Sequence, residues 1–375
     1  MRVLEVARQF YPRVGGIESC VLNLSRGLTG RGHSVEVVTL DRDLRDRRPI
    51  ESPASIDSIP IHRVPFFGSS RYPIAPGWFR FGNNFDVVHI HAIDFFVDSA
   101  ALARRLGLLR KPVIVTTHGG IFHTPAWPSL KTLYWNSVLK SSLGAVATVV
   151  AVSDHDARLF ASIVPPEKLA TIPNGIDPRF PAAARAATQR RTLITFGRVT
   201  KTKRIDQIIE LFGAVAADFP DLDLIVAGPD ENETIDTLRS QSERLGLAER
   251  IRFTGALPGD QLAALVASGT LFISAAPHEG FGITTVEALS AGIPVLVTRT
   301  GVHDQIVEPG RNGWFWSGVS DTNAVATLRE ALLLPVARID ALRAAARESA
   351  APFDWSLTTE KYERVLESAY RKSLG

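Results

Sequence analysis

Two glutamates, Glu279 and Glu287, stand eight residues apart and are the residues of this sequence best placed to do chemistry. The apolar run 270–276 in front of them predicts a buried strand, and residues 283–292 predict a short helix that ends on a glycine. The two carboxylates therefore flank a turn that leads from a strand into the first turn of a helix.

The glycines of this turn indicate what it binds. Gly280 and Gly282 let the backbone approach a ligand closely, and the N–H groups and positive dipole end of the helix attract a phosphate. Two carboxylates would repel a phosphate that bound alone, so a polyhydroxylated group must separate them from it. One carboxylate can accept hydrogen bonds from sugar hydroxyls and the other from a ribose diol. The pattern predicts a site for a nucleoside diphosphate sugar.

A basic loop follows the apolar strand expected at 192–196. Arg198 comes just after this strand and Lys203 five residues later, between Lys201 and Arg204. Cations at the end of a strand can neutralise the charge that develops on a diphosphate leaving group. A basic loop that only faces solvent is the structural alternative.

The first half of the chain repeats the order of strand, glycine loop and helix. Gly15 and Gly16 precede a helix after the first strand, and His118 and Gly119 follow a strand at 112–117. In open α/β sheets, ligands bind beyond the carboxyl ends of the strands, so His118 is well placed to meet a transferred sugar. A histidine that merely caps the strand is the alternative.

A buried strand at 86–91 carries two histidines on one face, His89 and His91. They could ligate a metal, but no third ligand lies nearby in sequence, so a hydrogen-bonded polar cluster at the end of the strand is expected instead. Asp94, three residues beyond the strand, could face an acceptor. We expect no metal site.

The alternation of strands and helices over 375 residues predicts an α/β protein with two doubly wound, Rossmann-like domains that face each other across a cleft. We expect an N-terminal domain at 1–178 and a C-terminal domain at 190–354, joined by a linker rich in proline and alanine. Residues 68–84 are expected to form a long loop. A last helix is expected at 355–375.

The segment from Glu279 to Glu287 resembles the E-x7-E signature of glycosyltransferase family 4, the retaining transferases of GT-B fold, and the resemblance covers essentially the whole chain. It implies that the last helix crosses back onto the first domain. The family usually has glycine where this chain has Arg204. The resemblance implies catalytic roles for His118, Glu279, Arg198 and Lys203. It implies a donor site, without metal or other cofactor, that contains Gly15, Gly16, Arg198, Lys203, Glu279, Phe281, Gly282, Ile283 and Glu287.

Segments 8–12, 68–76, 94–96 and 117–124 look like those of the family members that act as mannosyltransferases in xanthan- and acetan-type exopolysaccharide assembly. This implies an α-mannosyltransferase that uses GDP-mannose as donor and a polyprenyl-diphosphate glycolipid, cellobiosyl diphosphopolyprenol, as acceptor. A transferase that uses a UDP-sugar or another acceptor, a GT-B sugar-nucleotide epimerase and a non-catalytic regulator are the alternatives. The acceptor-side candidates are Tyr11, Asp94, Gly119 and His123.

Charge and composition bear on where the chain works. Residues 1–180 carry a surplus of six positive charges, and the only cysteine, Cys20, permits no internal disulfide. We expect no signal peptide, no membrane span and no nucleic-acid partner. A lipid-bound acceptor instead predicts a cytoplasmic protein that associates peripherally with the inner face of the cytoplasmic membrane. The segment 127–140 has the aromatic and basic residues of a lipid interface, although packing on the core would also explain it. Other basic candidates are Arg104, Arg105, Arg110 and Lys111.

Overall fold

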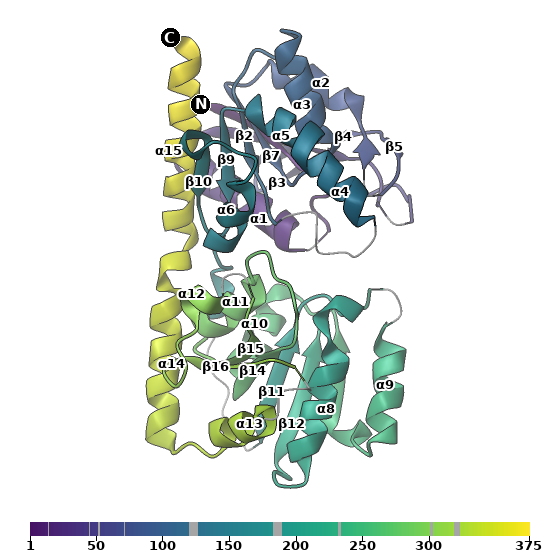
Figure 1. Ribbon diagram of the computed structural model, residues 1–375, viewed down its shortest axis with the longest axis vertical. Coiled ribbons are helices and arrows are strands. Elements are labelled where there is room, and N and C mark those ends of the chain that lie inside the picture. Colours follow the sequence, from purple (N-terminus) through teal and green to yellow (C-terminus); the bar gives the residue numbers. More distant parts are fainter. Residues whose placement is uncertain are drawn as a thin grey trace. The chain divides into compact units, whose positions relative to one another are not determined.

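The chain forms two compact units, a first unit of residues 1–175 and 355–375 and a second unit of residues 176–354 (Figure 1). The computed structural model describes residues 1–13, 15–44, 46–51, 53–70, 72–119, 127–182, 190–231, 234–300, 303–318 and 323–375. Helix α7 (Arg179–Ala182) lies in the stretch expected to be linker and belongs to the second unit.

The first unit is built on an eight-stranded sheet in the order β10-β9-β8-β7-β1-β2-β4-β3. All neighbouring strands are parallel except β3 and β4. Its inner strands are buried on both faces, which explains their nearly continuous apolar runs. The strands are β1 (Arg2–Val6), β2 (Ser34–Leu40), β3 (Ser55–Ile56), β4 (Ile59–Val64), β7 (Val87–His91), β8 (Val113–Thr116), β9 (Thr148–Ala151) and β10 (Leu169–Thr171).

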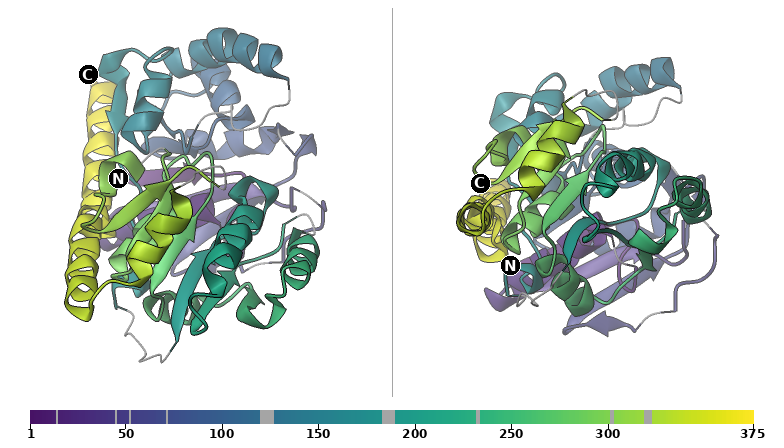
Figure 2. Two further views of the ribbon diagram at one scale, coloured as in Figure 1. Left: turned by 60° about the horizontal axis from the view of Figure 1, so that its bottom comes forward. Right: turned by 90° about the horizontal axis from the view of Figure 1, so that it is seen from below.

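Helices cover both faces of this sheet (Figure 2), and the faces alternate along each strand. Leu4 packs on one face with α3 (Phe95–Arg105), the π-helical turn η2 (Trp135–Leu139) and α6 (Asp154–Phe160). Val3 packs on the other face with α1 (Gly16–Gly30) and α15 (Trp355–Leu374). The remaining helical segments are α4 (Pro128–Tyr134), α5 (Lys140–Gly144) and η3 (Pro166–Lys168).

The expectation of a long loop at 68–84 was wrong. This stretch contains strand β6 (Pro73–Ile74), which pairs with β5 (Phe67–Gly68), then η1 (Pro76–Trp78) and α2 (Phe79–Gly82). Trp78 is fully buried and donates a hydrogen bond to Ser99 Oγ at 3.1 Å. One buried tryptophan therefore anchors a segment whose glycines and prolines suggested a loop.

The second unit is built on a six-stranded parallel sheet in the order β13-β12-β11-β14-β15-β16. Strand β16 was not anticipated from the sequence. The strands are β11 (Arg191–Phe196), β12 (Leu222–Ala227), β13 (Ile251–Gly255), β14 (Leu271–Ser274), β15 (Val295–Thr298) and β16 (Gly313–Trp316).

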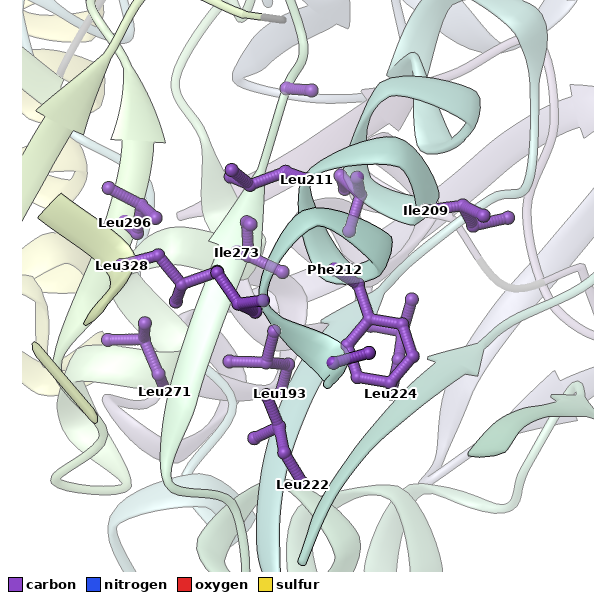
Figure 3. Packing of buried hydrophobic residues seen from close by; sticks show 14 of the residues in the cluster. Leu193, Ile209, Leu211, Phe212, Leu222, Leu224, Leu271, Ile273, Leu296 and Leu328 are labelled. Atoms are coloured by element: carbon purple, nitrogen blue, oxygen red, sulfur yellow. The ribbon is translucent and has the colours of Figure 1, made fainter. Parts of the chain in front are cut away.

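Helix α8 (Ile205–Ala216) packs its apolar side on one face of this sheet (Figure 3). Phe212 on the helix and Leu193 on β11 belong to the same buried cluster. The other helical segments are α9 (Thr234–Arg244), α10 (Gly259–Ala267), α11 (Ile283–Ser290), α12 (His303–Ile306), α13 (Ala324–Leu332), α14 (Val336–Ala350), η4 (Lys201–Lys203), η5 (Ala248–Arg250) and η6 (Ala351–Phe353).

Each sheet has a point at which the strand order reverses direction. In the first unit it lies between β1 and β7, and in the second unit between β11 and β14. The loops that leave the carboxyl ends of such a strand pair diverge to opposite faces, which leaves a crevice where ligands bind in open α/β sheets. The Rossmann-like fold expected for each half is confirmed, and both halves have a defined place for a site.

Candidate active site

The second unit opens a pocket at the reversal between β11 and β14. Residues at the strand ends and the start of α11 line it, among them Phe196, Gly197, Arg198, Lys203, Ser274 and Thr284. Gly197 has φ +116° and Gly228 has φ +145°, values that side chains disfavour. A Cβ on Gly228 would also collide with the Gly197 carbonyl oxygen. Two glycines therefore let neighbouring loops pack closely at the floor of the pocket.

Helix α11 begins at Ile283, as the sequence predicted, and Gly282 before it adopts φ +85°. This left-handed conformation turns the chain sharply from β14 into the helix. The first N–H groups of a helix have no partner within it, so the start of α11 can donate hydrogen bonds to an anion.

Each predicted cation of this unit pairs with a carboxylate. Lys203 Nζ contacts Glu279 Oε1, and Arg198 Nη1 donates to Glu231 Oε2 at 3.2 Å. The side chain of Arg198 stays 59% exposed and that of Lys203 27% exposed. Both cations therefore remain open to solvent and can exchange a carboxylate for a phosphate.

Glu287 lies apart from this cation pair, near Asp177 and Arg179. Burial and then the Asp177 carboxylate raise the pKa of Glu287 to about 8, against the opposing effect of Arg179. Asp177 accepts a hydrogen bond from Arg179 Nε at 2.8 Å. The two glutamates of the motif therefore have different environments, one beside a lysine and one in a half-buried place that favours the protonated acid.

Sequence reasoning missed His303, whose side chain is fully buried beneath α11. Its Nδ1–H donates to the Thr298 carbonyl at 2.8 Å, so its Nε2 accepts from Thr285 Oγ1 at 2.8 Å. Burial lowers the pKa of His303, which favours this neutral form. The ring ties the first turn of α11 to the end of β15, and no local sequence signal distinguishes it from any other histidine.

Phe281, expected among the donor-binding residues, turns its side chain into the second unit. The ring is 4% exposed and meets Phe353 edge-on, with 5.5 Å between ring centroids. Its side chain therefore stabilises the turn, and only its backbone remains for a ligand.

In the first unit, Gly16 is the first residue of α1 and Gly15 caps the helix in an extended conformation. A Cβ on Gly15 would collide with the Glu18 carboxylate, which folds back over the helix start. A negative group already occupies the positive end of this helix. The predicted role of Gly15 and Gly16 beside a diphosphate therefore requires Glu18 to move away.

Asp94, which we expected could face an acceptor, is buried at the start of α3. It is 1% exposed, accepts a hydrogen bond from Phe96 N at 2.9 Å as the N-cap of α3, and lies 3.1 Å from Arg8 Nε. Burial raises its pKa to about 6, against the effect of Arg8. Tyr11, on the loop after β1, is half-buried, and its carbonyl accepts a hydrogen bond from Arg63 Nη2 at 2.6 Å.

His118 leaves strand β8 with φ +50°, a left-handed conformation that is strained for a residue with a side chain. Asp156 holds this loop because it accepts hydrogen bonds from the Thr117 hydroxyl and the Gly119 backbone. His118 is half-buried, whereas Asp156 is 1% exposed. His123, the remaining acceptor-side candidate, lies outside the described residues.

The polar cluster expected around His89 and His91 is present and includes Glu5, which the sequence did not suggest. All three side chains are fully buried, and ligand atoms of the three lie within 4.8 Å of one another, close enough to hold a metal ion. Glu5 Oε2 lies 2.6 Å from His91 Nε2 and 2.9 Å from His89 Nδ1. The His91 contact is a hydrogen bond, so a ring N–H already satisfies Glu5 Oε2. The absence of a metal stays a prediction.

Comparison with known proteins follows the same division of the chain. The family model described as Glycosyltransferase Family 4 matches residues 14–180, and that of Glycosyl transferases group 1 matches residues 177–350. The GDP-mannose:cellobiosyl-diphosphopolyprenol alpha-mannosyltransferase of Komagataeibacter xylinus is 35% identical over 100% of this chain and 95% of its own length. The protein of the same name from Xanthomonas campestris is 34% identical over 96% and 95%.

Solved structures with low sequence identity share the fold. Sucrose-phosphate synthase from Thermosynechococcus elongatus superposes with a TM-score of 0.78 at 17% identity, over 99% of both chains. HepE of Anabaena, in complex with UDP and glucose, gives a TM-score of 0.76 at 18% identity, over 98% of this chain and 100% of its own.

Proposed function

The chain belongs to glycosyltransferase family 4 and has the GT-B fold, and from this premise we propose that it transfers α-mannose from GDP-mannose to cellobiosyl diphosphopolyprenol. The observation that carries the proposal is the extent of the similarity to the mannosyltransferases of that name. It covers the first unit as well as the donor-binding motif of the second. Nothing in the described residues favours a UDP-sugar donor or an epimerase.

The pocket of the second unit supplies the groups that a departing nucleoside diphosphate needs. Arg198, Lys203 and the start of α11 bring positive charge and N–H donors to one end of the sheet. Such groups stabilise the negative charge that develops when the bond between the sugar and the diphosphate breaks. We propose that these groups take the place of a divalent metal and that the anomeric configuration is retained.

The two glutamates of the motif receive separate roles in this proposal. Glu279 lies beside Lys203 and therefore binds hydroxyls of the transferred sugar close to the breaking bond. Glu287, in its own half-buried environment, accepts hydrogen bonds from the ribose diol. Because the ribose does not change during transfer, Glu287 contributes to donor binding more than to turnover.

The first unit supplies His118, which we propose contacts the transferred sugar. The left-handed backbone at His118 and the Asp156 bonds beside it hold the ring at the end of β8. This strand is next to β7 at the reversal of the sheet, where a ligand is expected. Tyr11, Asp94, Gly119 and His123 stay the acceptor-side candidates.

We also propose that the first unit docks peripherally on the inner face of the cytoplasmic membrane, because the proposed acceptor is lipid-linked. Of the helices in the described part of the chain, none is long and apolar enough to span a bilayer. The segment 127–140 has an outward apolar side: Leu130, Leu133 and Val138 are 57%, 64% and 48% exposed. Trp135 and Leu139 of the same segment are buried, which fixes this orientation. The exposed Lys140 adds attraction to anionic lipid.

The basic residues on α3 and just after it differ in their exposure. Arg104 Nε donates to the Ala145 carbonyl at 3.1 Å, and a second hydrogen bond joins its guanidinium to the Lys111 carbonyl. It therefore holds α3 in place rather than contacting lipid. Arg105 also donates to Ser141 Oγ at 2.8 Å, but it is exposed, as is Arg110 beyond the helix, and both remain candidates for the membrane contact.

The proposed reaction is tested by incubating the protein with GDP-mannose in the presence and absence of a lipid extract that contains cellobiosyl diphosphopolyprenol. Release of GDP that depends on the lipid, with a mannosylated lipid as product, supports the proposal. An epimerised nucleotide sugar, or faster transfer from UDP-glucose, would contradict it.

A further inference from the structure

A chain of hydrogen bonds links Glu5, at the centre of the first sheet, to His118 at the end of β8. His91 stands in the middle of it. Its Nε2 lies 2.6 Å from Glu5 Oε2, and its Nδ1 lies 3.0 Å from His118 Nε2. The His91 and His118 rings stack with 5.3 Å between centroids. A carboxylate, a buried ring and a half-buried ring therefore lie in series.

The carboxylate sets the direction of these hydrogen bonds. Burial alone would raise the pKa of Glu5, but the His89 and His91 rings outweigh it and lower the pKa to about 2. An ionised carboxylate can only accept hydrogen bonds, so His91 Nε2 must carry a hydrogen. Burial lowers the pKa of His91 to about 4, so the ring is neutral and its Nδ1 holds a lone pair.

The same reasoning extends to the next ring. His91 Nδ1 can only accept, and it lies at hydrogen-bond distance from His118 Nε2, so His118 Nε2 must carry a hydrogen. Burial and the neighbouring His91 lower the pKa of His118 well below its usual value, which keeps this ring neutral as well. The remaining nitrogen of His118, Nδ1, is then a hydrogen-bond acceptor.

We propose that Glu5 and His91 are positioning residues that hold His118 in its Nε2–H tautomer, so that Nδ1 accepts a hydrogen bond from a hydroxyl of the substrate sugar. The placement of His118 at the sugar rests on the proposed function, whereas the tautomer follows from the first unit alone. Glu5 and His91 are fully buried and His118 is half-buried, so the chain of hydrogen bonds runs from the interior to a residue that is partly exposed.

His118 therefore acts as an acceptor and not as an acid in the resting enzyme. A ring in the opposite tautomer would present an N–H to the same sugar hydroxyl and would compete for its oxygen. Loss of the correct tautomer in a catalytic histidine lowers turnover by as much as about 10⁴-fold in the well-known serine protease case.

Histidine-selective ¹⁵N labelling and long-range ¹H–¹⁵N correlation spectra test the proposal in the wild-type protein. The chain has nine histidines, and a His118→Gln variant assigns the signal. We expect a neutral ring with the hydrogen on Nε2. A hydrogen on Nδ1 would overturn the proposal, and it is also the result expected if a metal bound His91 Nε2, because His91 Nδ1 would then donate to His118.

Substitutions along the chain of hydrogen bonds provide the second test. Glu5→Gln keeps the size of the side chain but lets it donate as well as accept, so we expect His118 to become a mixture of tautomers. His91→Phe removes the acceptor for His118 and should have the same effect. Tyr362→Phe is the control. It removes the hydroxyl that lies 3.2 Å from Thr116 Oγ1 but keeps the ring, whose centroid is 5.4 Å from that of His89, so the His118 tautomer should not change.

Kinetics then relate the tautomer to the reaction. In Glu5→Gln we expect kcat to fall about tenfold or more, with the GDP-mannose KM within about twofold of wild type. A mixture of tautomers without a change in kcat would show that His118 does not contact the sugar. That result contradicts the proposed role of His118 in the reaction but not the inference that Glu5 and His91 set its tautomer. A folded Glu5→Gln or His91→Phe protein whose His118 keeps a single Nε2–H tautomer would overturn the inference itself.

Discussion

The two units place charged side chains at equivalent points of their sheets but treat them in opposite ways. At the reversal between β1 and β7, Glu5 and two histidines are sealed in the interior with 0% exposure. At the reversal between β11 and β14, Lys203 and Arg198 stay open to solvent beside carboxylates. A closed cluster can orient a side chain, whereas an open one can exchange its partners for those of a ligand.

Glu5 in the first unit and Glu287 in the second unit also differ in their pKa values. The pKa of Glu5 is lowered to about 2, since the histidines outweigh burial, whereas burial and Asp177 raise the pKa of Glu287 to about 8. One carboxyl is therefore charged at neutral pH and the other is mostly protonated. The pH responses of the two units should accordingly fall in different ranges, below about pH 4.5 for Glu5 and near pH 8 for Glu287.

The largest effect should come from the open cluster. We expect Lys203→Ala to lower kcat by about 100-fold or more, because it removes charge that stabilises the departing diphosphate. Lys201→Ala, on the same turn but exposed, is the matched control and should change kcat by less than about twofold. Steady-state kinetics with both substrates decide this, and equal effects of the two changes would remove Lys203 from the reaction.

Removing the Glu5 carboxylate from the closed cluster should instead lower the stability of the protein. Glu5→Ala leaves ring N–H groups without a partner in the interior, so we expect a loss of about 2 kcal/mol in the free energy of unfolding, measured by urea denaturation. Glu279→Ala in the open cluster should change stability by less than about 0.5 kcal/mol while turnover falls.

The pH dependence of stability tests the same comparison between Glu5 and Glu279. Because the pKa of Glu5 is lowered on folding, its contribution to stability is present above about pH 4.5 and is lost as the pH falls toward about 2. Equal stability losses in Glu5→Ala and Glu279→Ala would show that the two clusters do not differ in the way proposed.

Glu287 should give a tenfold effect in a different pH range, near its pKa of about 8. Its pKa of about 8 means that the carboxyl is protonated below that pH, and the ribose diol needs the ionised form as an acceptor. We expect the KM for GDP-mannose to rise about tenfold between pH 9 and pH 7. The pH-independent isostere Glu287→Gln should show a high, flat KM with little change in kcat. A flat profile in the wild type would contradict the assignment to the ribose.

Membrane binding should show the smallest effect. Lys140→Ala should weaken sedimentation with anionic liposomes by about fivefold, because a basic residue near an anionic surface contributes about 1 kcal/mol. Replacing Leu130, Leu133 and Val138 by serine should weaken it further, and binding should decrease with salt. Leu333 and Val336 in the second unit are 67% and 75% exposed, and their replacement by serine is the matched control. Equal binding to neutral and anionic liposomes would count against this docking surface.

Local patterns in the sequence were enough to predict much of the fold. The apolar runs of the parallel strands and the glycine before α11 are local signals, and the structure has these elements within a few residues of the predicted bounds. Strand β16 was missed although its two tryptophans are buried, and Trp316 Nε1 donates to the Ser274 carbonyl of β14 at 2.9 Å. That partner lies 42 residues away, so no local periodicity reveals it.

The environments of the site residues were harder to predict for the same reason. The shared face of His89 and His91 is visible in the sequence, but their partner Glu5 is 86 residues from His91. That Asp94 could face an acceptor stays a prediction, and the sequence did not reveal that it also caps a helix and contacts Arg8. Side-chain chemistry alone does not tell whether a carboxylate serves a ligand or its own fold.

The central claim is the transfer of α-mannose without a metal, and one measurement tests it most directly. The protein is given GDP-mannose and cellobiosyl diphosphopolyprenol in the presence of EDTA, and the anomeric configuration of the lipid-linked product is determined by NMR. We expect an α-linked mannose formed at the same rate with and without EDTA. A β-linked product, or a reaction that stops in EDTA and resumes with Mn²⁺, would contradict the claim.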